Sequence, residues 1–233
     1  MTKNLIVQFF VSVEKYSDPT YNQIGINEEL YNYSTISVKQ YAKRIGVDYK
    51  LITEPKINWV HPTFERFDLF FNDEWWKQYD NILYLDTDVI AWPTAPNVFT
   101  EYPSTHSFKP VFDRIARKNT LEYHKQRANG TCLEKFDASI LQKNRFNAGV
   151  FMLNKHCVDM MRPFLDYKNI KGDDNEQLIY AMLESNVEVD KMDWKYNKKN
   201  GTDCYFGHAA GQQKFRPKYD MLEKAKEIFD YSL

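Results

Sequence analysis

Long hydrophobic runs are missing from the sequence. No apolar stretch approaches the roughly 20 residues of a membrane-spanning helix, so we expect no transmembrane segment. The chain starts with Met-Thr-Lys-Asn and a strand-like run without a small-residue cleavage site, so we expect no signal peptide. Cysteine is scarce: Cys132, Cys157 and Cys204 are an odd number without metal-type spacing. These features fit a reducing compartment and predict a cytoplasmic protein.

An excess of one charge is missing as well. The 233 residues include 31 Lys plus Arg and 32 Asp plus Glu, which gives no case for nucleic-acid binding. Repeats, low-complexity tracts and an interdomain linker are also absent from the sequence. A chain of this length can bury one substantial core, so we expect a single domain. Nothing in the composition indicates its oligomeric state.

The sequence does contain strand-like and helix-like segments in alternation. This order predicts an α/β fold with a mostly parallel central sheet flanked by helices. Residues 4–13, 27–45 and 47–53 give a β-α-β pattern, with Gly46 just past the helix, and imply a right-handed crossover. Further strands are expected at 82–85, 146–153, 187–193 and 204–208. Further helices are expected at 63–79, 112–127, 155–165, 173–184 and 219–231, with a proline-rich loop region over 93–110.

Two aspartates end the most strongly apolar of these strands. Residues 82–85 are apolar without a break, as in a strand buried on both faces. Asp86 and Asp88 follow, and side chains two apart on an extended chain point the same way. Two such carboxylates need a cation, or one must take a proton. We therefore predict a divalent-metal site for an anionic ligand at this strand end, where open α/β sheets bind ligands. The alternative is a solvated turn.

Four segments carry a resemblance to a known family. They are Tyr84-Leu85-Asp86-Thr87-Asp88, Phe146-Asn147-Ala148-Gly149-Val150-Phe151, Asp174-Asn175-Glu176-Gln177-Leu178 and His208-Ala209-Ala210-Gly211-Gln212-Gln213-Lys214. In this order the chain resembles a retaining glycosyltransferase of the GT-A fold, close to glycosyltransferase family 8. That group includes glycogenin and the bacterial lipopolysaccharide galactosyltransferases. The resemblance extends from the first strand to about residue 215.

The resemblance implies a metal centre. Asp86, Asp88 and His208 would hold Mn²⁺ or Mg²⁺, and the cation would bridge the diphosphate of a nucleotide-sugar donor, a UDP-sugar in the first instance. Carboxylate oxygens suit such hard divalent ions. Gly211 would let backbone N–H groups face the phosphates. Lys214 would bind the leaving diphosphate as a point charge.

The resemblance also implies a site for the donor sugar. Asn147 would contact the sugar, and the small residues Ala148 and Gly149 would let backbone and ligand approach closely. Asp174 would hold the sugar hydroxyls, and Asn175 would lie beside the anomeric carbon. The alternatives are that the glycine only marks a bulge and that the acidic cluster at 173–174 caps a helix.

Weaker matches extend the donor site. Arg66, ahead of the two aspartates, would contact the donor, unless it is an ordinary surface arginine. Thr87 would belong to the same site. Phe9 and Val11, at the end of the first strand, would hold the nucleotide base, largely through backbone contacts. Residues 194–197, Trp-Lys-Tyr-Asn, resemble the family's Trp-Asn element.

The expected activity is transfer of a sugar to a hydroxyl of a glycan or glycoconjugate acceptor, with retention of anomeric configuration. Asp174, Asn175 and Lys214 are the catalytic candidates. Asp174 or Glu176 could act as a nucleophile, and same-face attack is the alternative that we favour. Residues 1–92 would form the nucleotide-binding half, 93–217 the donor-sugar and acceptor half, and 218–233 a terminal helix.

Two rival functions stay open. A haloacid-dehalogenase-type phosphatase also has Asp-x-Asp after an apolar strand, and Gly172-Asp173-Asp174 could mimic its later acidic motif. That motif normally follows the first strand, and Ile90 stands where Thr or Val is expected. The phosphatase also leaves His208 and Lys214 without a role. The second rival is a GT-A-like module that binds nucleotide or glycan without turnover.

Overall fold

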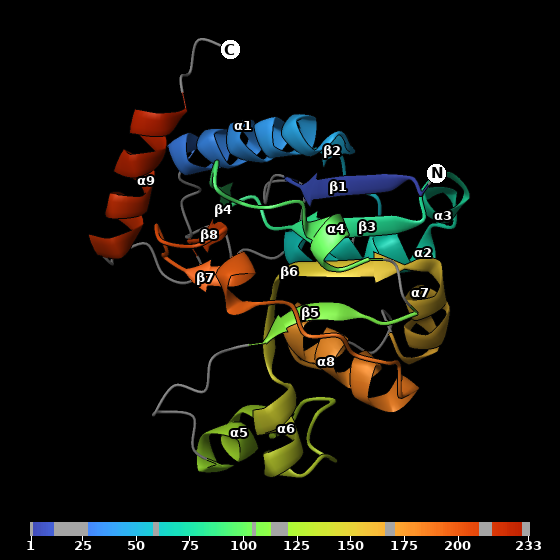
Figure 1. The fold of residues 1–233 in the computed structure, drawn as a ribbon. Helices are drawn as coiled ribbons and strands as arrows, with labels where there is room; N and C mark the ends of the chain where they lie inside the picture. The colour runs from blue at the N-terminus through green and yellow to red at the C-terminus, as the bar shows by residue number, and fades with distance from the viewer. Residues whose placement is uncertain are drawn as a thin grey trace.

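A central sheet organises the structure, a computed structural model that describes residues 2–11, 28–57, 61–103, 106–112, 121–165, 171–209 and 216–229, without the side chains of 216–219. Among these residues, five strands form the central sheet in the order β2-β1-β3-β6-β5, and a smaller sheet has the order β4-β8-β7 (Figure 1). The central strands are Asn4–Phe9 (β1), Asp48–Ile52 (β2), Asn81–Leu85 (β3), Lys109–Phe112 (β5) and Phe146–Asn154 (β6). The smaller sheet contains Val89–Ala91 (β4), Lys198–Lys199 (β7) and Phe206–His208 (β8).

The strand directions confirm the α/β class. β1 pairs in parallel with β2 and with β3, whereas β6 runs antiparallel to both β3 and β5. β6 is thus the reversed strand of the central sheet, and the other four share one direction. The reversal matters for the site, because it brings the start of β6 to the carboxyl end of β3.

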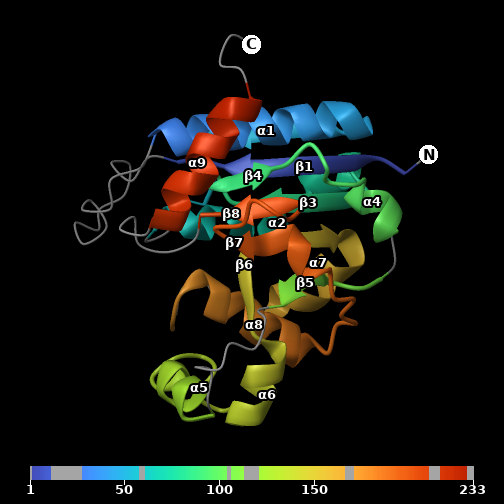
Figure 2. The ribbon, with the colours of Figure 1, turned by 60° about the vertical axis from the view of Figure 1, so that its left-hand side comes forward.

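Helices cover both faces of this sheet. They are Glu28–Ile45 (α1), Asp68–Phe71 (α2), Glu74–Gln78 (α3), Val98–Glu101 (α4), Leu121–Ala128 (α5), Ala138–Asn144 (α6), Lys155–Met161 (α7), Asp174–Ser185 (α8) and Arg216–Ile228 (α9). Shorter 3₁₀ segments lie at Pro62–Phe67, Arg162–Phe164 and Trp194–Asn197. In Figures 1 and 2, α5 and α6 lie at the opposite end of the molecule from α1, beyond α8.

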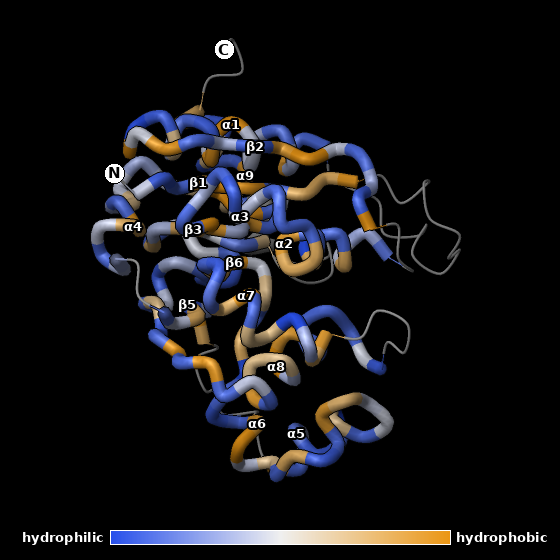
Figure 3. The backbone as a smooth tube through the Cα atoms, turned by 90° about the vertical axis from the view of Figure 1, so that its right-hand side faces the viewer, coloured by the Kyte–Doolittle hydropathy of each residue, from blue (hydrophilic) through white to orange (hydrophobic). Residues whose placement is uncertain are grey.

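The core forms in two layers because side chains alternate along each strand. Leu5 and Val7 of β1 point to a cluster shared with α2, α3, α7 and α8. Ile6, between them, points to the opposite cluster, which includes Val38 and Tyr41 of α1. In Figure 3, α1 accordingly alternates between hydrophilic and hydrophobic stretches, as expected for a helix with one buried face.

Several sequence-based boundaries were wrong. The expected loop region 93–110 contains α4 and the start of β5, and the expected helix 112–127 is helical only from Leu121 within the described residues. The expected helix 63–79 is divided into a 3₁₀ segment and two short α-helices. Residues 187–193 form two isolated bridges, at Val189 and Met192, instead of a strand. The end of the first predicted strand and Asn27, the first residue of the expected helix 27–45, lie outside the described residues.

Gly46 follows α1 as predicted, with a φ of 71° that favours glycine. The three cysteines are free thiols. Within the described ranges, no helix has the length and apolar character needed to cross a membrane.

Candidate metal and donor site

A tight turn, not an extended segment, carries the two aspartates. The Asp86 N–H donates to the carbonyl of Gly149 at 2.8 Å, so the sheet continues one residue past β3. The Val89 N–H then donates to the carbonyl of Asp86 at 3.1 Å, which closes a turn over Thr87 and Asp88. The two aspartates therefore do not point the same way because of side-chain alternation along an extended strand, and that part of the prediction was wrong. The two carboxylates nevertheless converge, because the turn folds back into β4.

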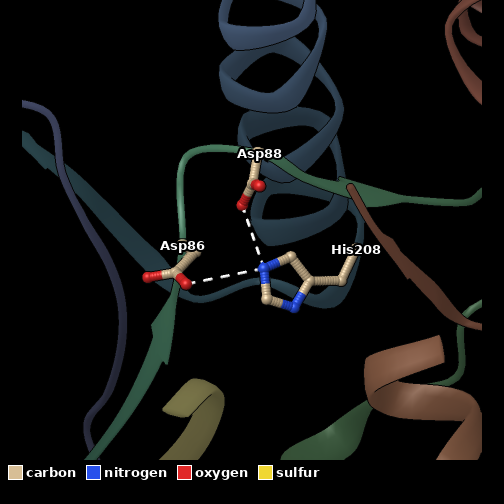
Figure 4. Close-up of side chains that lie close together, drawn as sticks. All are labelled: Asp86, Asp88 and His208. Atoms are coloured by element: carbon tan, nitrogen blue, oxygen red, sulfur yellow. Dashed lines mark ion pairs between the residues drawn. The ribbon is translucent and has the colours of Figure 1, made fainter. Parts of the chain in front are cut away.

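Strand pairing brings the imidazole of His208 to these carboxylates. β8 lies antiparallel to β4 with His208 opposite Val89, and the Ala209 N–H donates to the carbonyl of Asp88 at 3.0 Å. The His208 Nε2 atom lies 3.0 Å from Asp88 Oδ1 and 3.5 Å from Asp86 Oδ2 (Figure 4). Residues 86, 88 and 208 thus meet at the carboxyl end of β3, an arrangement that the family resemblance implied.

The donor atoms fit a divalent cation. One ligand atom from each of Asp86, Asp88 and His208 lies within 4.8 Å of the others. The His208 Nδ1 atom lies 2.7 Å from Asn197 Oδ1, and the Asn197 amide nitrogen donates to the Asn147 carbonyl at 3.1 Å. With this assignment Nδ1 carries a proton toward Asn197, and Nε2 is the ring nitrogen that faces the carboxylates. Metal-binding histidines are commonly oriented in this way by a second partner.

Charges in the site compensate one another. Burial lowers the pKa of His208, but attraction to Asp88 and hydrogen bonds with both carboxylates outweigh it and raise the pKa to about 10. Burial raises the pKa of Asp86, but the Arg66 guanidinium and His208 outweigh it and hold the pKa at about 2. The ring proton on Nε2 would therefore leave when a metal enters, as metal ligands require.

Arg66 lies beneath the site and is not a surface arginine. It is 4% exposed, and its guanidinium donates to Asp86 Oδ1 at 2.9 Å and to the Ala148 carbonyl at 2.6 Å. The same group forms an ion pair with Asp174 Oδ2 at 3.1 Å. It also stacks on the ring of Tyr84, whose hydroxyl donates to Asp86 Oδ1. Arg66 therefore connects the turn, β6 and α8.

Gly149 is required by the position of the histidine ring. A Cβ atom at Gly149 would lie 2.1 Å from His208 Cε1 and 2.8 Å from Asn147 Oδ1. Its φ is not in the left-handed region, so space and not backbone conformation excludes a side chain. Ala148, the preceding residue, is fully buried.

The acidic segment at the start of α8 divides into two roles. Asp173 is the N-cap and forms a capping box with Glu176, so the capping alternative holds for this residue. Asp174 instead pairs with Arg66, and burial raises its pKa to about 6, although Arg66 lowers it. Asn175 Oδ1 accepts a hydrogen bond from the Ala148 N–H at 2.6 Å, which ties α8 to β6 beside Asn147.

The remaining predicted residues lie as follows. Thr87 is half-buried in the turn, and Phe9 and Val11 are buried at the end of β1. Gly211 and Lys214 lie outside the described residues, so their expected roles stay predictions.

Sequence reasoning missed the polar residues that support the turn. Gln8 is fully buried, and its amide nitrogen donates to the Asp86 carbonyl and to Ser34 Oγ, both at 3.0 Å. Ser34 in turn donates to the Val89 carbonyl at 2.7 Å, and the Ala91 N–H donates to Ser37 Oγ. The one available signal was a glutamine inside the apolar run of β1.

Comparison with known proteins establishes the fold. No protein-family model matches the chain, and no curated protein matches its sequence. A glycosyltransferase involved in the glycosylation of the major capsid of PBCV-1 aligns with a TM-score of 0.54 at 11% identity, over 97% of this chain and 99% of its own. The galactosyltransferase LgtC, solved with donor and acceptor sugar analogs, aligns with a TM-score of 0.50 at 15% identity, over 96% and 95%. The chain has the GT-A glycosyltransferase fold.

A third GT-A neighbour is larger. WbbM, a bifunctional glycosyltransferase, aligns with a TM-score of 0.57 at 12% identity over 96% of this chain, which spans 49% of WbbM. At sequence identities this low, the similarity to these structures establishes the fold alone. The chemistry must be argued from the residues of this chain.

Proposed function

We propose that this protein is a metal-dependent glycosyltransferase that transfers a sugar from a nucleotide diphosphate, UDP in the first instance, to a hydroxyl of a glycan or glycoconjugate. The observation that carries the proposal is the convergence of Asp86, Asp88 and His208 on one point. They come from a turn and a strand 120 residues apart in the sequence, at the edge where this fold class binds ligands.

Two carboxylates and a neutral imidazole are suited to Mn²⁺ or Mg²⁺ in a nucleotide site. When bound, the cation would neutralise charge that develops on the departing diphosphate. Asn197 would keep the His208 ring in the ligating tautomer, and Arg66 would fix one oxygen of Asp86. Lys214, outside the described residues, would add a positive charge beside the leaving group.

The donor sugar would lie where β6 meets α8. Asn147 and Asn175 adjoin there through the Ala148 N–H, and Asp174 lies behind them on Arg66. Transfer with retention requires a nucleophile or attack from the leaving-group side. Asp174 is paired and buried, and Glu176 is engaged by the capping box and by Arg127. Their engagement favours same-face attack, with a donor phosphate oxygen taking the acceptor proton.

A donor screen tests the proposal. UDP-, GDP- and CMP-sugars are incubated with the protein and Mn²⁺, and release of nucleotide is measured with and without chelator. We expect release from a UDP-sugar that stops when the metal is removed. Asp88→Asn should abolish this release and the metal-dependent binding of UDP. Asp159→Asn, which changes an exposed aspartate on α7, is the matched control and should behave as wild type.

The rivals predict different results in the same assay. Release of phosphate from a generic phosphomonoester with Mg²⁺, without sugar-nucleotide cleavage, would identify a phosphatase. Metal-dependent UDP binding without turnover of any donor would identify a silent binding module. Near-normal activity of Asp88→Asn would refute the metal assignment.

A further inference from the structure

A pocket shares two lining residues with the candidate donor site. It encloses about 550 Å³, including open solvent at its mouth, and lies between α5, α6, the start of β6 and the first turn of α8. Asn147 and Asn175 form part of its lining. Asp86, Asp88 and His208 do not line it. Figures 1 and 2 show α5 and α6 as a separate pair of helices beyond α8.

The lining is suited to a sugar ring. Apolar walls come from α5, α6, β6, α8 and the segment after α5: Ala128, Leu133, Leu141, Phe146 and Ile179. The two asparagines, His124 and four charged side chains complete the lining. A pyranose presents apolar C–H faces and a rim of hydroxyls, so it matches a pocket whose lining combines apolar and polar side chains.

Charges in the lining are balanced. The pocket contains Arg127 and Arg145 together with Asp173 and Glu176. Arg127 is already committed, at 3.1 Å from Asp173 Oδ2 and 3.0 Å from Glu176 Oε1. A ligand with a net charge would gain little electrostatic attraction, because the positive and negative side chains of the lining offset one another. An uncharged ligand is favoured.

A second observation in favour of a sugar ligand concerns His124, a buried histidine in the lining. It is 3% exposed and lines the pocket, and its Nε2 atom finds no hydrogen-bond partner within the described part of the chain. Burial and the nearby charge of Arg145 lower the pKa of His124, so the ring is neutral and can donate or accept. A buried polar atom without a partner costs free energy in the folded state. A hydroxyl group that reached Nε2 would remove this cost.

The pocket is connected to the cation site. The Asn147 carbonyl accepts from Asn197, and Asn197 Oδ1 contacts His208 Nδ1. The part of the pocket lined by Asn147 and Asn175 therefore lies at the residues that would hold the donor sugar. A hydroxyl placed there would be close to the reacting carbon, as an acceptor must be.

We propose that this pocket is the acceptor subsite and takes an uncharged sugar, with His124 hydrogen-bonded to one of its hydroxyls. The identification of the bound sugar as the acceptor rests on the proposed function, because the sugar of a donor offers the same hydroxyl chemistry. The experiment must therefore separate free sugars from sugar nucleotides.

Two histidines report the two sites in one spectrum. Protein labelled with ¹³C-histidine is recorded by ¹H–¹³C correlation NMR, and His124→Gln and His208→Gln identify the two signals. His106 and His156, which contact each other outside both sites, serve as internal references. The probes are four methyl glycosides (of glucose, galactose, N-acetylglucosamine and N-acetylgalactosamine), galacturonate, UDP with Mg²⁺, and UDP-glucose and UDP-galactose with Mg²⁺.

We expect at least one neutral glycoside to shift the His124 signal saturably and to leave His208 in place. Galacturonate should bind at least tenfold more weakly than the galactoside. The proposal is overturned when no glycoside shifts His124, when only sugar nucleotides do so, or when galacturonate binds more tightly. UDP with Mg²⁺ should shift His208, and its failure to do so counts against the proposed function and not against the pocket.

A filled pocket gives an independent test. Ala128→Leu adds three carbons to the lining and should weaken glycoside binding at least tenfold, while the response of His208 to UDP with Mg²⁺ remains. Ala138→Leu adds the same atoms on α6 outside the lining and should bind both probes as wild type does. Thermal melting verifies that both variants are folded. Unchanged glycoside affinity in Ala128→Leu would overturn the proposal.

Discussion

Gly149→Ala is the smallest change that tests the geometry of the site. The added Cβ would lie 2.1 Å from His208 Cε1, whereas two carbon atoms are comfortable at about 3.5 Å. The ring must therefore move by about 1.4 Å. It cannot do so and keep its contacts, because Nδ1 is held 2.7 Å from Asn197 and Nε2 lies 3.0 Å from Asp88. A metal ligand tolerates a displacement of only about 0.2 Å.

We expect Gly149→Ala to lose at least about tenfold in affinity for Mn²⁺, since disturbed partners of metal ligands cost about 10–100-fold. Overpacking a buried site should also lower the free energy of unfolding by about 1–3 kcal/mol. Metal binding is measured by electron paramagnetic resonance of free Mn²⁺, and stability by urea unfolding.

A double-mutant cycle identifies the cause. In a His208→Ala background the main clash is gone, so the stability cost of Gly149→Ala should fall, with a coupling free energy of at least about 1 kcal/mol. An equal cost in both backgrounds, or unchanged Mn²⁺ affinity in the single variant, would show that the ring does not occupy this position.

Further predictions concern the groups around the metal ligands. Asn197→Ala should weaken Mn²⁺ binding about 10–100-fold, measured by the same titration, because nothing then holds the His208 tautomer. Arg66→Met should lower the free energy of unfolding by about 3–5 kcal/mol in urea, because it leaves the buried carboxylate of Asp174 without its ion-pair partner. Lys214→Ala should lower turnover far more than UDP affinity, and equal losses would mean ground-state binding only. Burial raises the pKa of Asp174 from 3.8 to about 6, so the native state binds a proton more tightly than the unfolded chain does. The free energy of unfolding should therefore fall as pH rises through 6. Asp174→Asn should flatten this decline, measured by urea unfolding at a series of pH values.

Local sequence patterns predicted the elements that are strongly apolar. The runs 82–85 and 146–153 became β3 and β6, and the helix ahead of Gly46 became α1. β5 was hidden because it is an edge strand containing Pro110, and proline within a run argues against a strand unless the strand lies at an edge. Its place in the sheet depends on pairing with β6, which no local pattern reveals.

The sequence allowed the residues of the candidate site to be predicted, but not the backbone geometry and contacts that bring them together. The family resemblance brought His208 together with Asp86 and Asp88, and the pairing of β4 with β8 places them in contact. Side-chain alternation gave the wrong reason, since a turn orients the aspartates. The burial of Arg66 and the support from Gln8 depend on contacts between distant segments, so neither could be derived from spacing.

Pulsed electron paramagnetic resonance of Mn²⁺ bound with UDP tests the central claim most directly. Our account predicts a ¹⁴N coupling from one imidazole and a ³¹P coupling from the diphosphate, with the nitrogen signal lost in His208→Ala. A spectrum of Mn²⁺ without nitrogen coupling, or one that is unchanged in His208→Ala, would contradict the assignment of this site.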